Sequence, residues 1–405
     1  MSSGGARKPE FFTALNGLRF LAALCVVFYH YARKMAGFAD FPLAVRSLLN
    51  CGPAAVNFFF ILSGFVLANR YMREDSQGPN IRVFYWERFA RLYPAYMIGF
   101  LLFLPGAIGK YLLHSPAGGH GPATFALSAV LYSLMLQAWT PLAQSWNGPS
   151  WTLSVEAFMY LIFPLIVFRL KALNFKKTLL VLLFAWLAPA TVAACHALGF
   201  ISLNTWKIYV TNNPLLWAPL FVMGICAVNL LPTSRRAAPA TAIVVPAVAL
   251  VALVALAMGS ASWVEIYVTG GVAPLLLAVV LFCARTSGGI TKIIGGTVFN
   301  ALGRVSYVFY IIQAPMWHLW QHFVSFLAHI KVTERGYPAW QFWSFLPVLL
   351  LSSFAVERYV EAPARRWLLR HWKASPGHCV SIESQRARAN AAPKLEVPAL
   401  SRSAG

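Results

Sequence analysis

The sequence predicts an all-α, polytopic membrane protein with about ten transmembrane helices and one additional re-entrant or half-helix segment. Of its 405 residues, 59% are hydrophobic and only 11% are charged, and the mean hydropathy is +0.63. Apolar runs long enough to cross a bilayer recur from Phe11 to Val360. This composition excludes a cytosolic enzyme, a disulfide-stapled secreted domain and a disordered chain.

Ten segments have the length and apolar character of a membrane span. In chain order they are Phe11 to Ala32, Cys51 to Asn69, Tyr93 to Leu113, Ser150 to Leu170, Thr178 to Ala197, Pro214 to Leu231, Ala240 to Met258, Gly270 to Ala284, Leu302 to Phe323 and Phe342 to Val360. An eleventh stretch, Thr124 to Trp139, has roughly 16 residues, whereas a comfortable crossing needs about 20.

The basic residues decide how we interpret the short eleventh stretch. They cluster at Arg7 and Lys8, Arg70 to Arg91, Lys171 to Lys177, Arg235 and Arg236, Arg285 to Lys292, and Arg365 to Lys373. Ten spans place all of these clusters in the cytoplasm, as the positive-inside rule requires, and an eleventh full crossing would place the later ones outside. We therefore expect a re-entrant or half-helical stretch, a location in the plasma membrane, and both termini in the cytoplasm.

Three regions follow from this topology. Residues 1–10 form a cytoplasmic tail, residues 11–373 form the membrane-embedded domain, and residues 374–405 form a disordered cytoplasmic tail, since they contain few large apolar residues. The net charge of +21 is explained by topology and by attraction to membrane lipid, so nucleic acid is not an expected partner. The six cysteines are scattered without ligand spacing, and no metal site is predicted.

Ionisable residues away from the membrane interfaces are costly unless they face a cavity or a partner. Arg19 and His30 lie eleven positions apart in the first span, which puts them on one helix face about 16 Å apart. Glu156 lies inside the span that begins at Ser150 and has no basic neighbour in sequence. Counted from Ser150, Glu156 is about 9 Å deep, a depth comparable to that of His30, so the two side chains could meet.

One interpretation of Arg19, His30 and Glu156 is a buried polar network that only fixes helix packing. The alternative is catalytic. A histidine beside a carboxylate at an outward-facing cavity can act as a general base, because its pKa is near neutrality and the carboxylate can hold the tautomer. The shared face of Arg19 and His30 favours the catalytic interpretation.

Two further stretches contain candidate binding residues. Arg88 and Arg91 are three positions apart on one predicted helical face, and paired guanidinium groups suit either phosphate oxygens or lipid headgroups. Ser63, in a Ser-Gly pair that interrupts an aromatic run, could serve close helix packing or hydrogen-bond a ligand. No GxSxG elbow accompanies Ser63, which disfavours a hydrolase nucleophile.

The stretch from Gln144 to Ser154 combines indole rings with amide and hydroxyl groups. Trp146 and Trp151 offer flat apolar faces for a sugar ring, and Asn147 offers hydrogen bonds. An interfacial tryptophan belt is an equally weighted explanation of these residues.

In combination, these stretches resemble the acyltransferase-3 family of bacterial membrane O-acyltransferases. The residues that carry the resemblance are Leu15 to Phe20 with Tyr29 and His30, Phe58 to Phe65, Arg88-x-x-Arg91-x-x-Pro94, Trp151-x-Leu153-Ser154-Val155-Glu156, Leu302 to Tyr307 with Tyr310, and Val360 to Arg366. The resemblance covers nearly the whole membrane part of the chain.

The resemblance implies a ten-span protein that moves an acyl group from cytoplasmic acyl-CoA, most simply acetyl-CoA, to a hydroxyl of a sugar or a natural product. It implies that Arg88, Arg91 and Arg19 contact the donor. It further implies that Arg19, His30 and Glu156 form the catalytic group. We expect the acceptor to contact Ser63, Trp146, Asn147, Trp151 and Tyr310.

The chain departs from the family pattern at two places. Many relatives have a histidine where this chain has Gln313, and many have Arg and Glu where it has Trp217 and Leu220. The second departure puts a role of that span in acceptor recognition in doubt.

The hypothesis from sequence is therefore a general base, His30, that is oriented by Glu156 and acts on an acceptor hydroxyl of a cell-surface or exported glycan or glycolipid. A covalent acyl-histidine relay is a variant of this mechanism. Its rivals are an acyltransferase for a non-sugar product, a transporter or flippase for a lipid-linked glycan, and a non-catalytic membrane sensor. The sequence does not determine the oligomeric state.

Overall fold

The computed structural model describes residues 13–72, 80–114, 121–231, 270–285, 289–328 and 336–374. Most of the described residues are helical, and the only β-type pairing among them is an isolated bridge between Met35 and Tyr337. The predicted span Ala240 to Met258 and the tails 1–10 and 375–405 lie outside the described residues.

The first half of the chain contains α1 (Thr13–Tyr31), η1 (Ala32–Lys34), η2 (Phe38–Asp40), α2 (Leu43–Leu49), α3 (Gly52–Met72), α4 (Ile81–His114), α5 (Pro122–Ser133), η3 (Gln137–Trp139), η4 (Gly148–Ser150), α6 (Trp151–Lys171) and α7 (Phe175–Ala197). The second half contains α8 (Leu203–Thr205), η5 (Trp206–Val210), α9 (Pro214–Ala227), η6 (Val228–Leu230), α12 (Ala273–Arg285), α13 (Ile290–Ile294), α14 (Thr297–Ala328), α15 (Ala339–Val356), η7 (Glu357–Glu361) and α16 (Ala362–Ala374).

Six helical segments are long and apolar enough to cross a membrane, which confirms the polytopic class. They are Thr13–Lys34, Gly52–Met72, Ile81–Gly109, Gly148–Lys171, Phe175–Ala197 and Ala339–Trp372, and each overlaps a predicted span. The predicted spans at Pro214 and Gly270 correspond to shorter apolar helices, and α14, with 32 residues, covers the predicted span at Leu302. The total of about ten spans stays a prediction.

The questioned eleventh stretch forms a half-helix. Helix α5 has 12 residues, or about 18 Å of rise, against a hydrocarbon core of about 30 Å. The chain then runs through η3 and η4 into α6, and three of the polar residues on this path, Gln137, Asn147 and Ser150, are each at most 1% exposed. Irregular backbone at membrane depth is tolerated only when it is buried in protein, as it is here.

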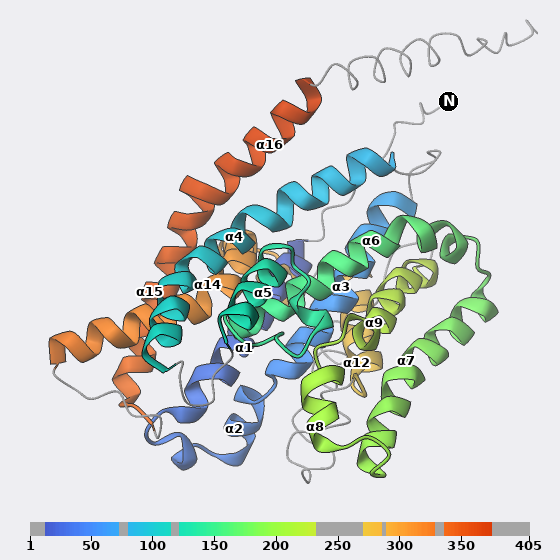
Figure 1. Cartoon of the computed structure of the whole chain (residues 1–405). Coiled ribbons are helices and arrows are strands. Elements are labelled where there is room, and N and C mark those ends of the chain that lie inside the picture. Colours follow the sequence, from blue (N-terminus) through green and yellow to red (C-terminus); the bar gives the residue numbers. More distant parts are fainter. Residues whose placement is uncertain are drawn as a thin grey trace, which may run out of the picture.

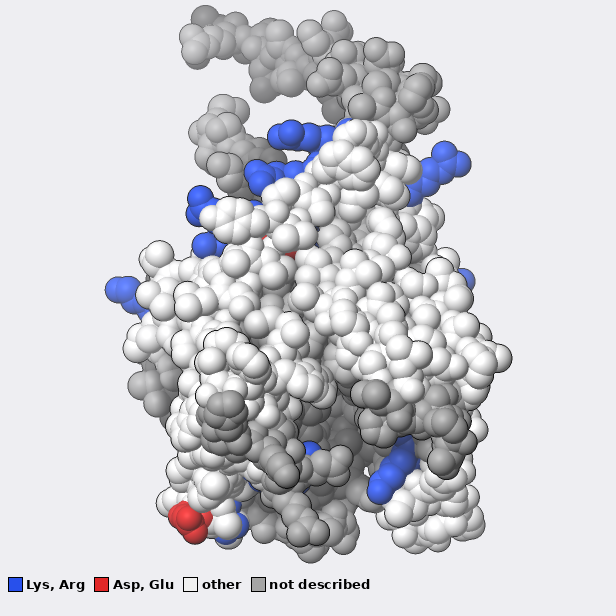
Figure 2. Space-filling view, turned by 60° about the vertical axis from the view of Figure 1, so that its left-hand side comes forward, with Lys and Arg blue, Asp and Glu red and all other residues white. Residues whose placement is uncertain are grey.

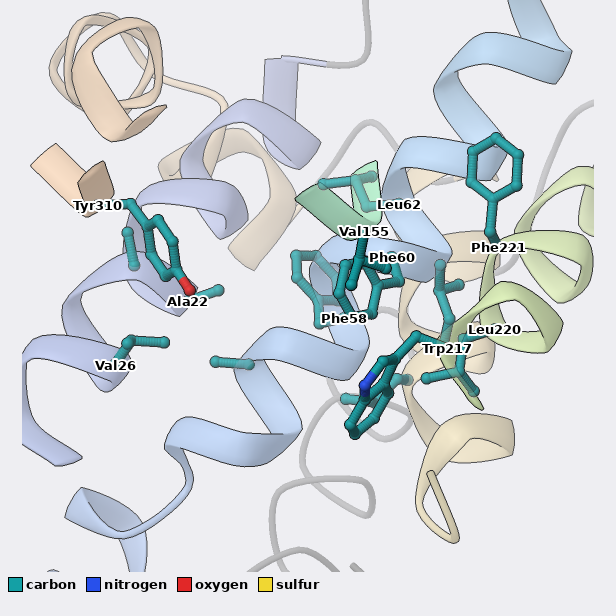
Figure 3. Close-up of a cluster of buried hydrophobic side chains, with 14 of the residues drawn as sticks. Ala22, Val26, Phe58, Phe60, Leu62, Val155, Trp217, Leu220, Phe221 and Tyr310 are labelled. Atoms are coloured by element: carbon teal, nitrogen blue, oxygen red, sulfur yellow. The ribbon is translucent and has the colours of Figure 1, made fainter. Parts of the chain in front are cut away.

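Helix α3 lies at the centre of the bundle and is the most buried of the six candidate spans. It crosses α9 at two glycines: a Cβ on Gly64 would overlap the carbonyl oxygen of Phe221, and a Cβ on Gly224 would overlap that of Ile61. The backbones therefore touch, as at the small-residue crossings of membrane helices. Figure 3 shows the apolar cluster around this crossing, in which Phe60 and Trp217 pack with ring centroids 5.7 Å apart.

Helices α1 and α14 run parallel, as three cross-contacts show. Asn16 donates a 3.1 Å hydrogen bond to Asn300, Phe20 packs on Phe309, and the ring of Tyr31 stacks on that of Trp317. Residue numbers therefore increase in the same direction along α1 and α14. Since α1 and α14 carry several of the candidate site residues, this pairing fixes their relative depths.

Charged side chains are concentrated at one end of the bundle. We define the basic end as the end where α16 lies beside the start of α4 (Figure 1). Figure 2 shows most of the Lys and Arg on this face at that end, above a broad belt of uncharged residues, with a few charged side chains at the opposite end. Helix α1 starts near the basic end and runs toward α2 at the opposite end (Figure 1), so Arg19 lies nearer the basic end than His30 does.

Candidate active site

The centre of the site is the carboxylate of Glu156 on α6. It accepts a 3.3 Å hydrogen bond from the hydroxyl of Ser63 on α3 and a 2.5 Å hydrogen bond from the hydroxyl of Tyr160. Tyr160 is four positions after Glu156, so the two side chains share a face of α6. The hydroxyl groups of two helices, α3 and α6, therefore hold this carboxylate in place.

Two arginines approach this carboxylate. Arg19 of α1 interacts electrostatically with Glu156 and with Arg91 of α4. Arg19 and Arg91 each also interact electrostatically with Tyr160. Tyr307 of α14 lies in the same electrostatic environment and donates a 2.7 Å hydrogen bond to the carbonyl of Leu92. The structure thus brings the predicted residues Arg19, Arg91, Glu156 and Ser63 together.

Arg88 lies at the basic end of the same region. Its guanidinium is 3.6 Å from the carboxylate of Glu87, which also pairs with Arg70 of α3 at 3.2 Å. It lies over the rings of Phe84 and Tyr160, 5.8 Å from each centroid. Helix α4 begins at Ile81, so Arg88 and Arg91 lie on one continuous helix. Both interact electrostatically with Tyr160, which agrees with the predicted shared helical face.

His30 lies apart from Glu156, and the contact that the estimated depths allowed is not formed among the described residues. Within the described residues His30 makes no hydrogen bond to Glu156; its ring contacts are with Tyr29 and Tyr31, and Arg33 is the charged group that acts on it. Glu156 interacts instead with Arg19, and α1 is continuous from Arg19 to His30, so these two positions of α1 are about 16 Å apart along the helix.

The depth estimated for Glu156 was counted from Ser150, and the structure buries Ser150 within the protein. The loop between α5 and α6 folds back into the protein, and the Nε2 of Gln137 donates a 3.1 Å hydrogen bond to the carbonyl of Ser150. Asn147 donates a 3.0 Å hydrogen bond to the carbonyl of Ile311 on α14. Helix α6 therefore starts inside the bundle, and counting from its first residue underestimates the depth of Glu156.

The same loop corrects the role expected for Trp146. Its indole is 6% exposed, stacks on Phe100 with centroids 5.1 Å apart, and donates a 3.0 Å hydrogen bond to Ser128. Phe125 and Tyr132 also stack against it. Trp146 packs α4, α5 and the loop together, and its faces are not free for a sugar ring.

The other expected acceptor contacts are also largely internal. Asn147 is 1% exposed, and Trp151 packs against Trp217 and Phe60. Tyr310 is buried beside Phe59, donates to the carbonyl of Pro149 and accepts from Thr152. Ser63, Trp151 and Tyr310 therefore lie inside the bundle on the side of Glu156, and none of them lies on an outer face.

The departures from the family pattern serve packing. Gln313 is fully buried and donates a 2.8 Å hydrogen bond to the carbonyl of Tyr310. Trp217 donates to the carbonyl of Thr211, and Leu220 is fully buried in the apolar cluster of Figure 3. Helix α9 therefore contributes apolar surface to the site and no charge.

Sequence reasoning assigned no site role to four residues of this site: Tyr160, Tyr307, Glu361 and Arg365. Tyr160 could have been found from its spacing of four from Glu156. Arg365 and Glu361 interact electrostatically with Arg91, which is more than 250 positions earlier in the chain. A local sequence pattern does not predict such a contact. The described residues contain no group of three or more His, Cys, Asp or Glu side chains that could hold a metal ion.

The fold and this site define a polytopic helical membrane protein with a partly buried cluster of arginines and a carboxylate. An acyltransferase domain model, that of the acyltransferase-3 family, matches residues 12–357. The chain therefore belongs to the acyltransferase-3 family, as its motifs predicted.

Known proteins resemble the chain to different extents. It is 32% identical over 194 residues to the acyltransferase MdmB of Streptomyces mycarofaciens, a match that covers 47% of this chain and 46% of MdmB. It is 20% identical over 395 residues to the putative O-acetyltransferase SAR0937 of Staphylococcus aureus, which covers 91% of this chain and 60% of that protein. The chain thus spans less than two thirds of either relative, and no solved structure matches it.

Proposed function

We propose that this protein is an integral-membrane O-acyltransferase that moves an acetyl group from acetyl-CoA to a hydroxyl of a sugar in a cell-surface or exported glycan or glycolipid. Membership of the family supports the reaction class. A relative named as a putative O-acetyltransferase, similar along 91% of this chain, supports acetyl as the acyl group.

The observation that carries the proposal is the spacing of Arg19 and His30 on one face of α1, about 16 Å apart. Arg19 lies among the arginines near the basic end, where CoA phosphates would bind. The pantetheine arm has twelve bonds from its phosphate ester oxygen to its sulfur, or about 14 Å when extended at the advance of a stretched backbone. The two lengths are comparable, so a donor bound by its phosphates near Arg19 would bring its thioester close to His30.

His30 acts as general base in the proposed reaction. Its imidazole takes the proton of the acceptor hydroxyl as that oxygen attacks the thioester carbonyl. The carbon–sulfur bond then breaks, the ester forms, and the imidazolium returns the proton to the departing thiolate, which leaves as free CoA. His30 is exposed, so an acceptor can approach it from outside the bundle.

Glu156 has a different part in this account from the one its sequence position indicated. It balances the charge of Arg19 and is held by Tyr160 and Ser63. We assign it to positioning Arg19 for the donor, while Tyr29, Tyr31 and Arg33 surround the imidazole.

The topology proposed for the reaction is a multi-pass protein of the bacterial plasma membrane, with the basic end and both termini in the cytoplasm. The gathering of Lys and Arg at one end (Figure 2) supports this orientation through the positive-inside rule. Acetyl-CoA is cytoplasmic, so the phosphate-binding arginines would face its source. The acceptor would meet His30 toward the opposite side.

Transfer of radiolabel from acetyl-CoA into the glycan and lipid fractions of membranes tests the proposal. Membranes with the wild type are expected to incorporate label, and His30→Ala membranes are not. His371→Ala, which changes an exposed histidine of α16, is the matched control and should incorporate label normally. Label in a non-carbohydrate product would show that the acceptor is not a sugar. Uptake of a glycan without CoA release would favour a transporter.

A further inference from the structure

The helix at the end of the described chain returns to the candidate donor site. Helix α15 continues through the π-helical turn η7 into α16, and α16 docks on α4 through Trp86. The indole of Trp86 donates a 3.1 Å hydrogen bond to the carbonyl of Leu368 and stacks on Trp372 with centroids 5.0 Å apart. Figure 1 shows α16 beside the start of α4 at the basic end.

This docking brings Arg365 to the arginines of α4. Arg365 interacts electrostatically with both Arg91 and Arg88, and with Glu361 one helical turn before it. It is partly buried, whereas its neighbour Arg366 is exposed and donates to the carbonyl of Ala362 in its own helix. Adjacent arginines of α16 thus have different surroundings.

Within the described residues, the arginines where α16 meets α4 have few carboxylate and hydrogen-bond partners. Ion pairs shorter than 4 Å here go to Glu87, from Arg70 and Arg88; Arg91 and Arg365 form none with a described carboxylate. The Nε atoms of Arg88 and Arg365 are buried without a hydrogen-bond partner. Converging guanidinium groups with unused buried donors are unfavourable unless an anion joins them.

We propose that Arg365 of α16 completes, together with Arg88 and Arg91 of α4, a three-sided site for the phosphate groups of the acyl donor. This inference rests on the proposed function and extends it to the C-terminal helix. The ligand class is a diphosphate that carries a further phosphate monoester, as CoA does, and a guanidinium binds such oxygens in bidentate fashion. Glu361 positions Arg365 through its charge and does not touch the donor.

Equilibrium binding of tritiated acetyl-CoA to the purified full-length protein in detergent, at about 0.15 M salt, tests this inference without knowledge of the acceptor. Arg365→Gln is expected to weaken binding about ten- to hundred-fold, the effect of losing a charge-assisted contact. Arg88→Gln should weaken it similarly. Arg366→Gln, which removes the same charge from the adjacent exposed position, should stay within about two-fold of wild type.

Arg365→Lys separates binding from folding. It keeps the charge beside Glu361 and Arg91 but loses the bidentate geometry, so a folded protein with weakened binding is expected. If the wild type binds and Arg365→Gln binds equally well, the inference is wrong and the proposed function stands. An equal loss in Arg365→Gln and Arg366→Gln would also overturn it, since general surface charge would then explain both. If the wild type itself does not bind acetyl-CoA, the proposed donor is wrong.

Discussion

Tyr160 and Glu156 form a hydrogen-bonded pair one turn apart on α6, with the phenol donating to the carboxylate at 2.5 Å. Ser63 donates to the same carboxylate from α3, and Arg19 balances its charge from α1. The pair therefore ties three helices together at the level of Arg19, about three helical turns away from His30.

Glu156→Gln tests whether this carboxylate serves Arg19 or His30. It should lower the free energy of unfolding by about 1–3 kcal/mol, because the hydroxyl groups and Arg19 lose a charged partner, and it should weaken acetyl-CoA binding. Thermal unfolding in detergent and donor binding measure both effects. Asp40→Asn, at an exposed acidic residue, is the control. Unchanged stability and donor affinity with abolished transfer would instead place Glu156 in the chemical step.

Gly64→Ala and Gly224→Ala should each destabilise the protein by about 1–3 kcal/mol or more, since the added methyl group meets backbone that cannot shift cheaply. Gly106→Ala in α4 is the matched control, because no atom lies within 4 Å of the added Cβ, and a helical alanine is favoured over glycine. The unfolding temperatures in one detergent should rank the control highest. Equal temperatures for all three would contradict the backbone contact of α3 and α9.

Trp146→Ala should cost about 3–5 kcal/mol of stability, as expected for a truncated core aromatic residue. Trp146→Phe keeps the stack on Phe100 and loses only the hydrogen bond to Ser128, so it should cost about 1 kcal/mol. If transfer is then assayed with varied acceptor, Trp146→Phe should leave the acceptor KM unchanged. A large rise in that KM in a stable protein would restore Trp146 as an acceptor contact.

Trp86→Ala should release α16 from α4, because it removes both the stack on Trp372 and the hydrogen bond to Leu368. Faster amide hydrogen exchange in α16 is the expected observation, together with weakened acetyl-CoA binding. Trp367→Ala, at a side chain that is 58% exposed, should change neither. Normal exchange in Trp86→Ala would show that α16 is held by other contacts.

Features encoded by local pattern were predictable from sequence. The apolar runs predicted the membrane class. The length of Thr124 to Trp139 and the charges predicted a re-entrant or half-helical stretch, and the spacing of Arg88 and Arg91 predicted their shared face. Helix α5 has 12 residues and α4 begins before both arginines. Length and periodicity suffice for such features, because they depend on residues close together in the chain.

Features that depend on the path of a loop were not predictable. Ser150 looked like the outer end of a span, but Gln137 and Asn147 bury that loop by bonding to Ser150 and Ile311. The depth of Glu156 and the packing of Trp146 both follow from this burial. The approach of Arg365 to Arg88 and Arg91 depends on Trp86 meeting Leu368 across 282 positions, which composition does not reveal.

The most direct test of the account is to compare donor binding and acetyl transfer in His30→Gln, since His30 is assigned to chemistry and the arginines to binding. The account predicts wild-type affinity for acetyl-CoA and a rate of label transfer lowered about 10²- to 10⁴-fold, the usual contribution of a general base. Transfer at the wild-type rate would contradict the role of His30. Loss of acetyl-CoA binding in a folded His30→Gln protein would contradict its separation from the phosphate site.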